Sequence, residues 1–443
     1  MFTLKVLSRI CFLILFFCCF SAGCSVKNAI TELFTERSFS GSLTFIDDNT
    51  PAAQDKLLDA IPTKFVGYIG ATSHEPKVRR DMFLSFSVHR AELMSIAVAA
   101  GGLSAYSADA EGNVFYSEII DAKGKAPLRL QTRLILSAES KINMLALSRD
   151  GRFIAVCTAD KIILADLQDK KIAAELTKIS GRVTALSWSA DNEYLAIGQI
   201  GRIILWKIFD DGEFVAHEMS NSGSMETYKG GITPVVGIYF YNPPKMLFSA
   251  DHGGHLSVRR LLKTEREMGL WGNDEKNLPL DVNTKNVNVD IAEAIDDFTY
   301  NEIHNELITA LGNGTVLWWK IRGLIPVKML DIGRYSVKNI ALLSYYDEKN
   351  HQTMYYFVTS SNDNIVKLWN AEEEGGEEAE NSSIRKLPKN IKLSRTMRFV
   401  DKKKSLNFQS DVFDEPIFDM KSAPDSPYLW LIQKSGKIII VNI

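Results

Sequence analysis

The best candidate for metal binding in this 443-residue sequence is the run Asp251-His252-Gly253-Gly254-His255. It places two imidazoles three positions apart beside a carboxylate, and zinc accepts nitrogen and oxygen ligands of these kinds. A protein site normally needs three ligands and a surrounding shell that orients them. The same glycines suit a tight hairpin turn, on which the two imidazoles need not converge. We therefore predict a turn here and no metal site.

Motifs for other chemistry are absent from the sequence. It contains no Gly-x-Ser-x-Gly nucleophile turn, no Walker loop, no Gly-x-Gly-x-x-Gly fingerprint and no paired Cys-x-x-Cys. The formal net charge of −3 gives no excess of lysine and arginine for contacts with nucleic-acid phosphates. We predict no catalytic residue, no cofactor, no nucleic-acid partner and no small-molecule substrate.

The first 24 residues have the layout of a secretory signal. Lys5 and Arg9 give a positive N-terminal region before an apolar run, Ile10–Phe20, which is shorter than the roughly 20 residues that span a bilayer as a helix. Small residues occupy positions 21–23 and Cys24 follows. The layout predicts a signal peptide of residues 1–23 that is cleaved between Gly23 and Cys24.

The cleavage region resembles the bacterial lipobox, because Ala22, Gly23 and Cys24 match it, whereas Ser21 stands where that family usually has Leu. The resemblance implies that Cys24 carries lipid, such as palmitate, and tethers the chain to an envelope membrane on its periplasmic side. Ser25, rather than Asp, resembles the pattern of outer-membrane lipoproteins. An ordinary signal peptide or an uncleaved anchor, with Cys24 incidental, is the alternative.

Cysteine use agrees with this layout. Three of the five cysteines leave with the signal, and Cys24 would carry the lipid. Only Cys157 remains, inside an apolar strand pattern, so no intrachain disulfide is expected in the mature chain. We expect Cys157 to be a small buried hydrophobe and not a reactive thiol.

One turn-and-strand element recurs seven times along the chain. A Gly, Asn or Asp that suits a tight turn is followed by an apolar, strand-forming segment, and two more strand patterns precede each instance. The basic unit of about 40 residues is the period of four-stranded propeller blades, and no amphipathic helix separates the strands. The sequence therefore predicts an all-β fold, a seven-bladed β-propeller over residues 81–443. The seven instances begin at Gly112, Asp160, Gly201, Gly254, Gly314, Asn364 and Gly436.

The repeats resemble those of the WD-repeat family. Trp206-Lys207, Trp319-Lys320 and Trp369-Asn370 stand where that family has its terminal Trp-Asp pair, and Ala165-Asp166 keeps the Asp alone. The Gly-His pair of the family is mostly missing, although its turn Asp has counterparts here. The resemblance implies that Trp206, Trp319, Trp369 and Asp166 belong to the repeat core; stacking on a ligand is the alternative for the tryptophans. The turn acids are Asp109, Asp160, Asp251 and Asp363.

The ends of the repeat region predict how it closes. The last repeat stops at Ile443 after its third strand, and an extra strand pattern, Met82–Val88, precedes the first repeat. We predict that this segment supplies the missing fourth strand, closes the ring and covers an edge that could template aggregation. Residues 24–80 form a tether and N-terminal extension, either a spacer or an extra layer on the propeller.

Two insertions interrupt the repeats. Gly272–Asp290 is polar, and the segment Glu372–Asn381 carries six glutamates, before a basic stretch over Arg385–Arg398. An acidic run of this kind has three possible explanations. It is a solvated loop, it binds a basic partner, or the basic stretch in the same loop neutralises its charge. The possible partner loop consists of Glu372, Glu373, Glu374, Glu377, Glu378 and Glu380.

Two classes of function fit this organisation. One is a membrane-tethered, non-catalytic interaction platform of the bacterial cell envelope, a subunit or accessory factor that binds other envelope proteins. The other is a propeller enzyme, such as a lyase, lactonase or dehydrogenase, with its site in the central channel. The innermost strand patterns are apolar except for Asp296, Asp297 and Asp419, which favours the platform. Acids or histidines converging around the channel would favour the enzyme.

Overall fold

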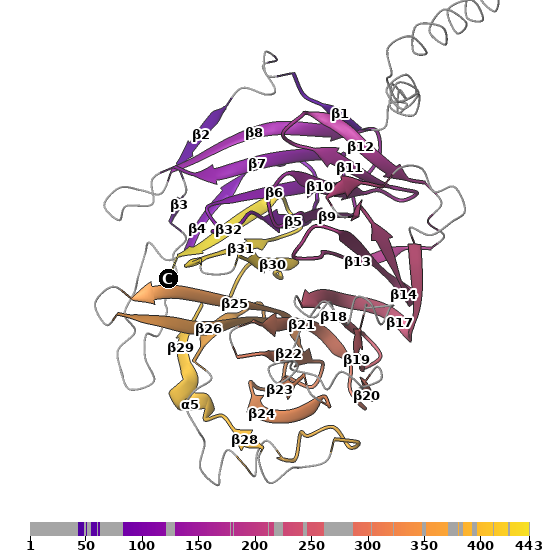
Figure 1. Ribbon diagram of the computed structural model, residues 1–443. Coiled ribbons are helices and arrows are strands. Elements are labelled where there is room, and N and C mark those ends of the chain that lie inside the picture. Colours follow the sequence, from indigo (N-terminus) through magenta and orange to yellow (C-terminus); the bar gives the residue numbers. More distant parts are fainter. Residues whose placement is uncertain are drawn as a thin grey trace, which may run out of the picture. The chain divides into compact units, whose positions relative to one another are not determined.

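The computed structural model describes the chain from Leu43 to Asn442 with internal gaps (Figure 1). The signal segment, Gly23 and Cys24 lie outside the described residues, and the region from Leu43 onward is one compact unit. Within this range the structure leaves out residues 48–49, 51–54, 60, 63–82, 121–128, 178, 180, 211, 217–224, 242–245, 261–286, 303, 322, 348–350, 371–379, 381–383, 392–396, 411 and 424–425.

The described residues fold almost entirely into antiparallel sheets, as the repeat pattern predicts. The first sheet has the order β1-β8-β7-β6-β5, with β2 also on β8, and the second has the order β12-β11-β10-β9. Their strands are β1 (Leu43–Phe45), β2 (Lys56–Asp59), β5 (Leu93–Val98), β6 (Ser104–Asp109), β7 (Asn113–Ile119), β8 (Arg129–Ala138), β9 (Met144–Leu147), β10 (Phe153–Cys157), β11 (Ile162–Asp166) and β12 (Lys171–Leu176).

The third and fourth repeats share one six-stranded sheet, β13-β14-β17-β18-β19-β20. A small ribbon of two strands, β15 and β16, follows β14 in the chain. The strands are β13 (Val183–Trp188), β14 (Tyr194–Lys207), β15 (Phe209–Asp210), β16 (Glu213–Phe214), β17 (Met225–Tyr241), β18 (Met246–Asp251), β19 (His255–Arg260) and β20 (Val287–Asp290).

Three further sheets complete the fold, with the orders β21-β22-β23-β24-β28, β25-β26-β27-β29 and β3-β4-β32-β31-β30. One short helix, α5 (Lys402–Ser405), precedes β29. The strands are β21 (Ile295–Asn301), β22 (Glu306–Leu311), β23 (Thr315–Lys320), β24 (Ile325–Asp331), β25 (Val337–Asp347), β26 (Gln352–Ser361), β27 (Val366–Trp369), β28 (Arg398–Phe399), β29 (Leu406–Gln409), β3 (Ile61–Pro62), β4 (Phe83–Ser87), β30 (Asp419–Ser422), β31 (Tyr428–Ile432) and β32 (Lys437–Asn442).

The described strands thus form six sheets of four or more strands, not the seven separate sheets that the sequence predicts. The reason lies in β14, which runs through two predicted strands, and in β17, which pairs with strands of both repeats. The residues that flank β14, Glu193 and Ile208, share a backbone hydrogen bond of 2.7 Å, so β14 folds back on itself. β17 pairs with β14 up to Pro234 and with β18 from Val235 onward, which joins the third and fourth repeats.

The inner strands of successive repeats contact one another around a common axis, which makes the fold a β-propeller (Figure 1). The contacts follow the order β5, β9, β13, β17, β21, β25 and β30, and β30 contacts β5. The middle strands have both faces covered by neighbouring sheets, so every residue of β10, β11 and β31 is buried. This explains their runs of β-branched and aliphatic residues without polar alternation.

The last sheet contains strands from both ends of the propeller. β4, which precedes the first repeat, pairs antiparallel with β32 from Phe83↔Val441 to Ser87↔Lys437. Leu84 and Phe86 enter a buried cluster with Trp430 and Ile440. Of the predicted segment Met82–Val88, residues Phe83–Ser87 therefore pair with the final strand.

The N-terminal extension adds strands to the rim of the propeller and is not only a spacer. β1 and β2 pair with β8, the outer strand of the first repeat, and β3 pairs with β4. Leu43 and Leu58 pack against the neighbouring cores. The extra strands cover the outer edges of β8 and β4, edges that would otherwise expose unpaired backbone groups.

The connections divide between two faces, because successive turns of an antiparallel sheet alternate between its ends. The turn face carries the connection between the second and third strands of each repeat and the connection into each repeat. Backbone hydrogen bonds join these two kinds of connection, for example Ala138 N to Gly112 O at 2.8 Å and Ile332 N to Gly314 O at 3.0 Å. The remaining connections, including the long insertions, leave from the opposite face.

Among the described residues, no helix is long and apolar enough to cross a membrane.

We expect β4 to be required for cooperative folding. Deleting residues 25–75 removes β1, β2 and β3, whereas deleting residues 25–90 also removes β4, so the difference between the two truncations reports on β4. Loss of β4 exposes the edge of β32 and the apolar side chains of that cluster, and the longer deletion should aggregate or lose its sharp thermal transition. Circular dichroism melting of both proteins tests this, and equal transitions would place the essential contact elsewhere.

Candidate functional site

The first repeat holds a serine–histidine–aspartate arrangement. His89, in the connection into the repeat, shares hydrogen bonds with Asp109 (Nδ1 to Oδ2, 2.9 Å) and with Ser107 (Nε2 to Oγ, 2.7 Å). Asp109 also accepts the backbone N–H groups of Glu111 and Asn113 at the turn. In outline this is the geometry of a nucleophile, a base and an orienting acid.

Because all three side chains are buried, this arrangement stabilises the fold and is not a reactive site. Ser107 and Asp109 are each 1% exposed and His89 is 6% exposed, so a substrate carbonyl has no access to the Ser107 hydroxyl. Burial raises the pKa of Asp109, but hydrogen bonds from His89 and the Asn113 backbone outweigh it, and the pKa lies below its usual range. The ionised Asp109 thus ties the incoming connection to the turn. The sequence resemblance identified Asp109 but did not connect it to His89.

The tryptophans that the sequence assigns to the repeat core are buried on third strands. Trp319 Nε1 donates to Thr309 Oγ1 and Trp369 Nε1 donates to Thr359 Oγ1, each at 2.9 Å. Trp206 is buried in the core between the second and third repeats. Their faces are not available to a ligand, because all three side chains are at most 1% exposed.

Asp166 ends β11 and fastens a turn. Its Oδ2 accepts Arg152 Nη2 at 2.8 Å, while its Oδ1 accepts the backbone N–H groups of Gln168 and Asp169. Asp166 is buried, whereas the Arg152 side chain is 42% exposed. Burial raises the pKa of Asp166, but the Arg152 guanidinium and the backbone donors bring it below its usual range.

Polar side chains gather on the inner strands at one side of the axis. Asp297 on β21 accepts Ile340 N from the next repeat at 2.9 Å, and Lys421 on β30 pairs with Asp419 at 3.2 Å. Burial raises the pKa of Asp297 to about 6, against the opposing charge of Lys421. The negative charge of Asp419 raises the pKa of Lys421, and burial raises that of Tyr239 on β17.

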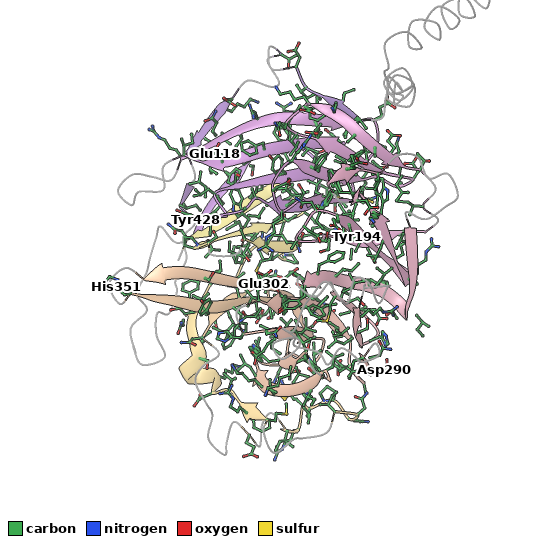
Figure 2. All side chains as sticks on the ribbon, in the orientation of Figure 1. Glu118, Tyr194, Asp290, Glu302, His351 and Tyr428 are labelled. Carbon is green, nitrogen blue, oxygen red and sulfur yellow. The ribbon has the colours of Figure 1, made fainter. Side chains whose placement is uncertain are left out.

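This axial group combines two acids with a lysine that compensates them. Asp297 bonds backbone N–H groups, including that of Phe298 at 2.9 Å, and links the fifth repeat to the sixth. Ser95 makes the same kind of link between the first and second repeats, since its hydroxyl accepts Leu145 N at 3.0 Å. At the opposite face, Arg149 and Glu302 (Figure 2) form an ion pair of 3.6 Å between the second and fifth repeats. These hydrogen bonds and this ion pair therefore join repeats to one another.

The two histidines of the predicted turn point to different partners. His252 Nδ1 lies 3.2 Å from Ile295 O and 3.5 Å from Asp296, whereas His255 Nδ1 lies 2.6 Å from Asp290. Asp251 Oδ1 accepts His255 N at 3.0 Å, as a turn acid does. In the described part of the chain, no three histidine, cysteine, aspartate or glutamate residues are arranged to hold a metal ion.

Cys157 lies in the middle of the second repeat and is 1% exposed. Burial raises the pKa of its thiol to about 12. Because the thiolate is the reactive form, the side chain contributes packing and not chemistry.

Exposed apolar side chains concentrate on the turn face. The described residues include nine large hydrophobic side chains that are exposed, and five of these belong to turn-face connections. Those on the opposite face include Leu103, Ile120 and Ile325. The five on the turn face are Ile200, Ile232, Tyr335, Val412 and Phe418.

Three of these side chains belong to neighbouring connections, and we call Tyr335, Val412 and Phe418 the apolar patch. Ser336 O accepts Asn362 N at 3.1 Å, and Asn364 O accepts Phe413 N at 2.9 Å, so one turn joins the connections on either side of it. The Lys434 ammonium lies 4.9 Å from the centre of the Phe418 ring. Exposed apolar patches with a polar border are typical of protein-interaction sites.

Most of the predicted partner loop lies outside the described residues. This holds for Glu372, Glu373, Glu374, Glu377 and Glu378, whereas Glu380 is described and exposed. Part of the following basic stretch is docked on the fifth repeat, where Lys386 pairs with Asp331 at 2.6 Å and Leu387 and Ile391 pack on the core. Of the other insertion, Gly272–Asp290, only β20 is described.

Comparison with known proteins agrees with this architecture. A segment of 120 residues is 30% identical to WD repeat-containing protein 1 of Bos taurus and of Rattus norvegicus, covering 26% of this chain and 19% of each relative. The crystal structure of the RRP9 WD40 repeats is similar over 81% of this chain and 97% of that chain, with a TM-score of 0.52 and 13% identity. No family model matches the chain.

We expect His89→Ala to lower the free energy of unfolding by about 2–4 kcal/mol, because it removes two hydrogen bonds and leaves the buried Asp109 carboxylate short of a donor. His351→Ala is the matched control, since His351 is exposed at the tip of the β25–β26 hairpin (Figure 2). Urea unfolding measures both, and equal stabilities would show that this network contributes nothing.

The same network has a defined pH dependence. Because the folded pKa of Asp109 is lowered, its contribution is complete above the usual carboxyl pKa of about 4 and is lost as the pH falls through the folded value. The stability difference between the wild type and Asp109→Asn should therefore shrink below about pH 4.

Proposed function

Since the chain is a divergent β-propeller of the WD-repeat type, we propose that it is a non-catalytic protein-interaction platform of the bacterial cell envelope. The observation that carries this proposal is the apolar patch on the turn face. A rigid scaffold presents it, so binding orders few side chains and loses little conformational entropy. We assign the protein as a subunit or accessory factor of a complex with other envelope proteins.

The apolar patch fits a protein partner with an apolar segment. Tyr335 and Val412 are 56% and 63% exposed, and tyrosine is among the residues that dominate binding energy in interfaces. Lys434 forms an ion pair with Glu92 at 2.9 Å and gives the patch a polar border. Of the acidic segment, Glu380 is the described residue, and we propose the segment as a second contact for a basic partner surface.

We propose that the six-stranded sheet works as two blades, so that the propeller has seven blades closed by β4. Support comes from the hairpin within β14, the change of partner along β17, and the cyclic contacts of the inner strands. The pairing of β4 with β32 supports closure by a strand that precedes the first repeat. In this arrangement every blade has the same four-stranded content.

We propose that a lipid on Cys24 tethers the platform to the membrane, facing the periplasm, with the outer membrane favoured by Ser25. The support for this is the lipobox-like sequence alone. A tether would raise the effective concentration of the platform against membrane-bound partners.

The double substitution Tyr335→Ser and Val412→Ser should weaken the complex by about 5–100-fold, because anchors of this size contribute roughly 1–3 kcal/mol in interfaces. Crosslinking and affinity capture from intact envelopes, with quantification of each partner, measures the loss. Ile325→Ser is the matched control, since Ile325 is 47% exposed on the opposite face. Unchanged capture by the double variant, or an equal loss with the control, would contradict the assignment of the patch.

Substitution Cys24→Ala should move the protein out of the membrane fraction or leave it unprocessed, because stable anchoring requires more than one acyl chain on the mature chain. Envelope fractionation and mass spectrometry of the N-terminal peptide test this. A processed variant that still sediments with membranes like the wild type would show that the tether is not a lipid on Cys24.

A further inference from the structure

Positive side chains from separate segments meet at the rim of the turn face, between the fifth and sixth repeats. Lys386 Nζ donates to Asp331 Oδ1 at 2.6 Å and to Gly333 O. Lys402 Nζ lies 3.6 Å from the position that a Cβ atom on Gly333 would occupy. Both ammonium groups are therefore beside the same glycine, in the connection between β24 and β25.

Two more cations border this point. Lys367 on β27 pairs with Asp363 at 3.5 Å, and both of these side chains are largely buried. Burial lowers the pKa of Lys402, and the positive charges of Lys367 and Lys386 lower it further, so the three ammonium groups act on one another. Arg334 follows Gly333 directly in the chain and is exposed.

The carboxylates that act on Lys402 are already matched to other lysines. These are Asp331, paired with Lys386, and Asp363, paired with Lys367. Among the described residues, Lys402 itself has no hydrogen bond or ion pair. Lys367, Lys386 and Lys402 thus exceed these two carboxylates by one positive charge.

Packing and backbone hydrogen bonds also hold the segments that carry Lys386 and Lys402. Asn313 Nδ2 donates to Lys386 O at 2.9 Å, and Leu387 and Ile391 are inserted beside the core of the fourth and fifth repeats. Val400 N donates to Met329 O at 2.9 Å, which holds the segment just before Lys402 on β24. Like charges at such separations repel, so the fold maintains an arrangement that an anion would stabilise.

We infer that Lys386, Lys402 and Arg334 form a binding site for an oxyanion of the phosphate class, with Lys367 adding positive charge behind them. A phosphate monoester carries close to two negative charges and three acceptor oxygens, which suits ammonium donors arriving from different segments. Tyr335, the next residue in the chain after Arg334, is 56% exposed. Free phosphate compounds and phospholipid headgroups offer this same chemistry.

Isothermal titration calorimetry of the full-length protein in detergent, at constant ionic strength, tests this site with two probes. Inorganic phosphate represents the free anion, and dihexanoyl phosphatidic acid, a soluble short-chain lipid, represents the headgroup. Lys402→Gln should weaken binding by about tenfold or more, as loss of a charge-assisted hydrogen bond does. Lys320→Gln, at an exposed lysine on the opposite face, should bind like the wild type.

The affinities for the two probes distinguish a free phosphate compound from a phospholipid headgroup as the ligand. Tighter binding of inorganic phosphate supports a free phosphate compound as the ligand, and tighter binding of the lipid supports a headgroup, provided that either depends on Lys402. Thermal unfolding of each variant confirms that it is folded. No binding of either probe by the wild type, or equal affinity in Lys402→Gln, would overturn the inference. Neither result depends on a protein partner or on Cys24, so the proposed platform stands or fails separately.

Discussion

The middle strands of the sheets in this protein are apolar on both faces, so such a sheet needs a neighbour on each side. β10, β11 and β31 are buried along their whole length, and no arrangement with free ends could cover them all. The cyclic contact of the inner strands satisfies this requirement. The pairing of β4 with β32 places strands from the two ends of the propeller region in one sheet.

Polar interactions in this fold fasten connections instead of performing chemistry. His89, Asp109 and Ser107 have the distances of a catalytic triad, but burial turns them into a link between the connection and the turn of the first repeat. Asp297 and Ser95 each accept a backbone N–H from the next inner strand. These hydrogen bonds satisfy backbone N–H groups on the inner edges of the sheets. Such groups have no neighbouring strand in their own sheet with which to pair.

Segments outside the repeats give the propeller its individual surface. The strands of the N-terminal extension cover the rim of the first and last sheets, and the segment around Lys386 crosses from the sixth repeat to the fourth and fifth. One consequence is that cations far apart in sequence, Lys367 and Lys402, meet near Gly333. The turn face thereby acquires an apolar patch and a positively charged rim side by side, a combination suited to recognition.

The sequence by itself determined the all-β class and the recurring strand pattern, because a strand pattern buried on both faces is local and recurs. It also predicted the buried tryptophans and the turn at Asp251. Only the tertiary structure decided that β14 and β17 join two repeats, that His89 meets Asp109, and that one turn links the connections that carry Tyr335 and Val412. Each of these depends on how strands and connections pair in the folded sheets, and spacing along one chain carries no signal of such contacts. The same limit applies to the cations around Gly333, whose proximity follows from packing of the inserted segment between sheets.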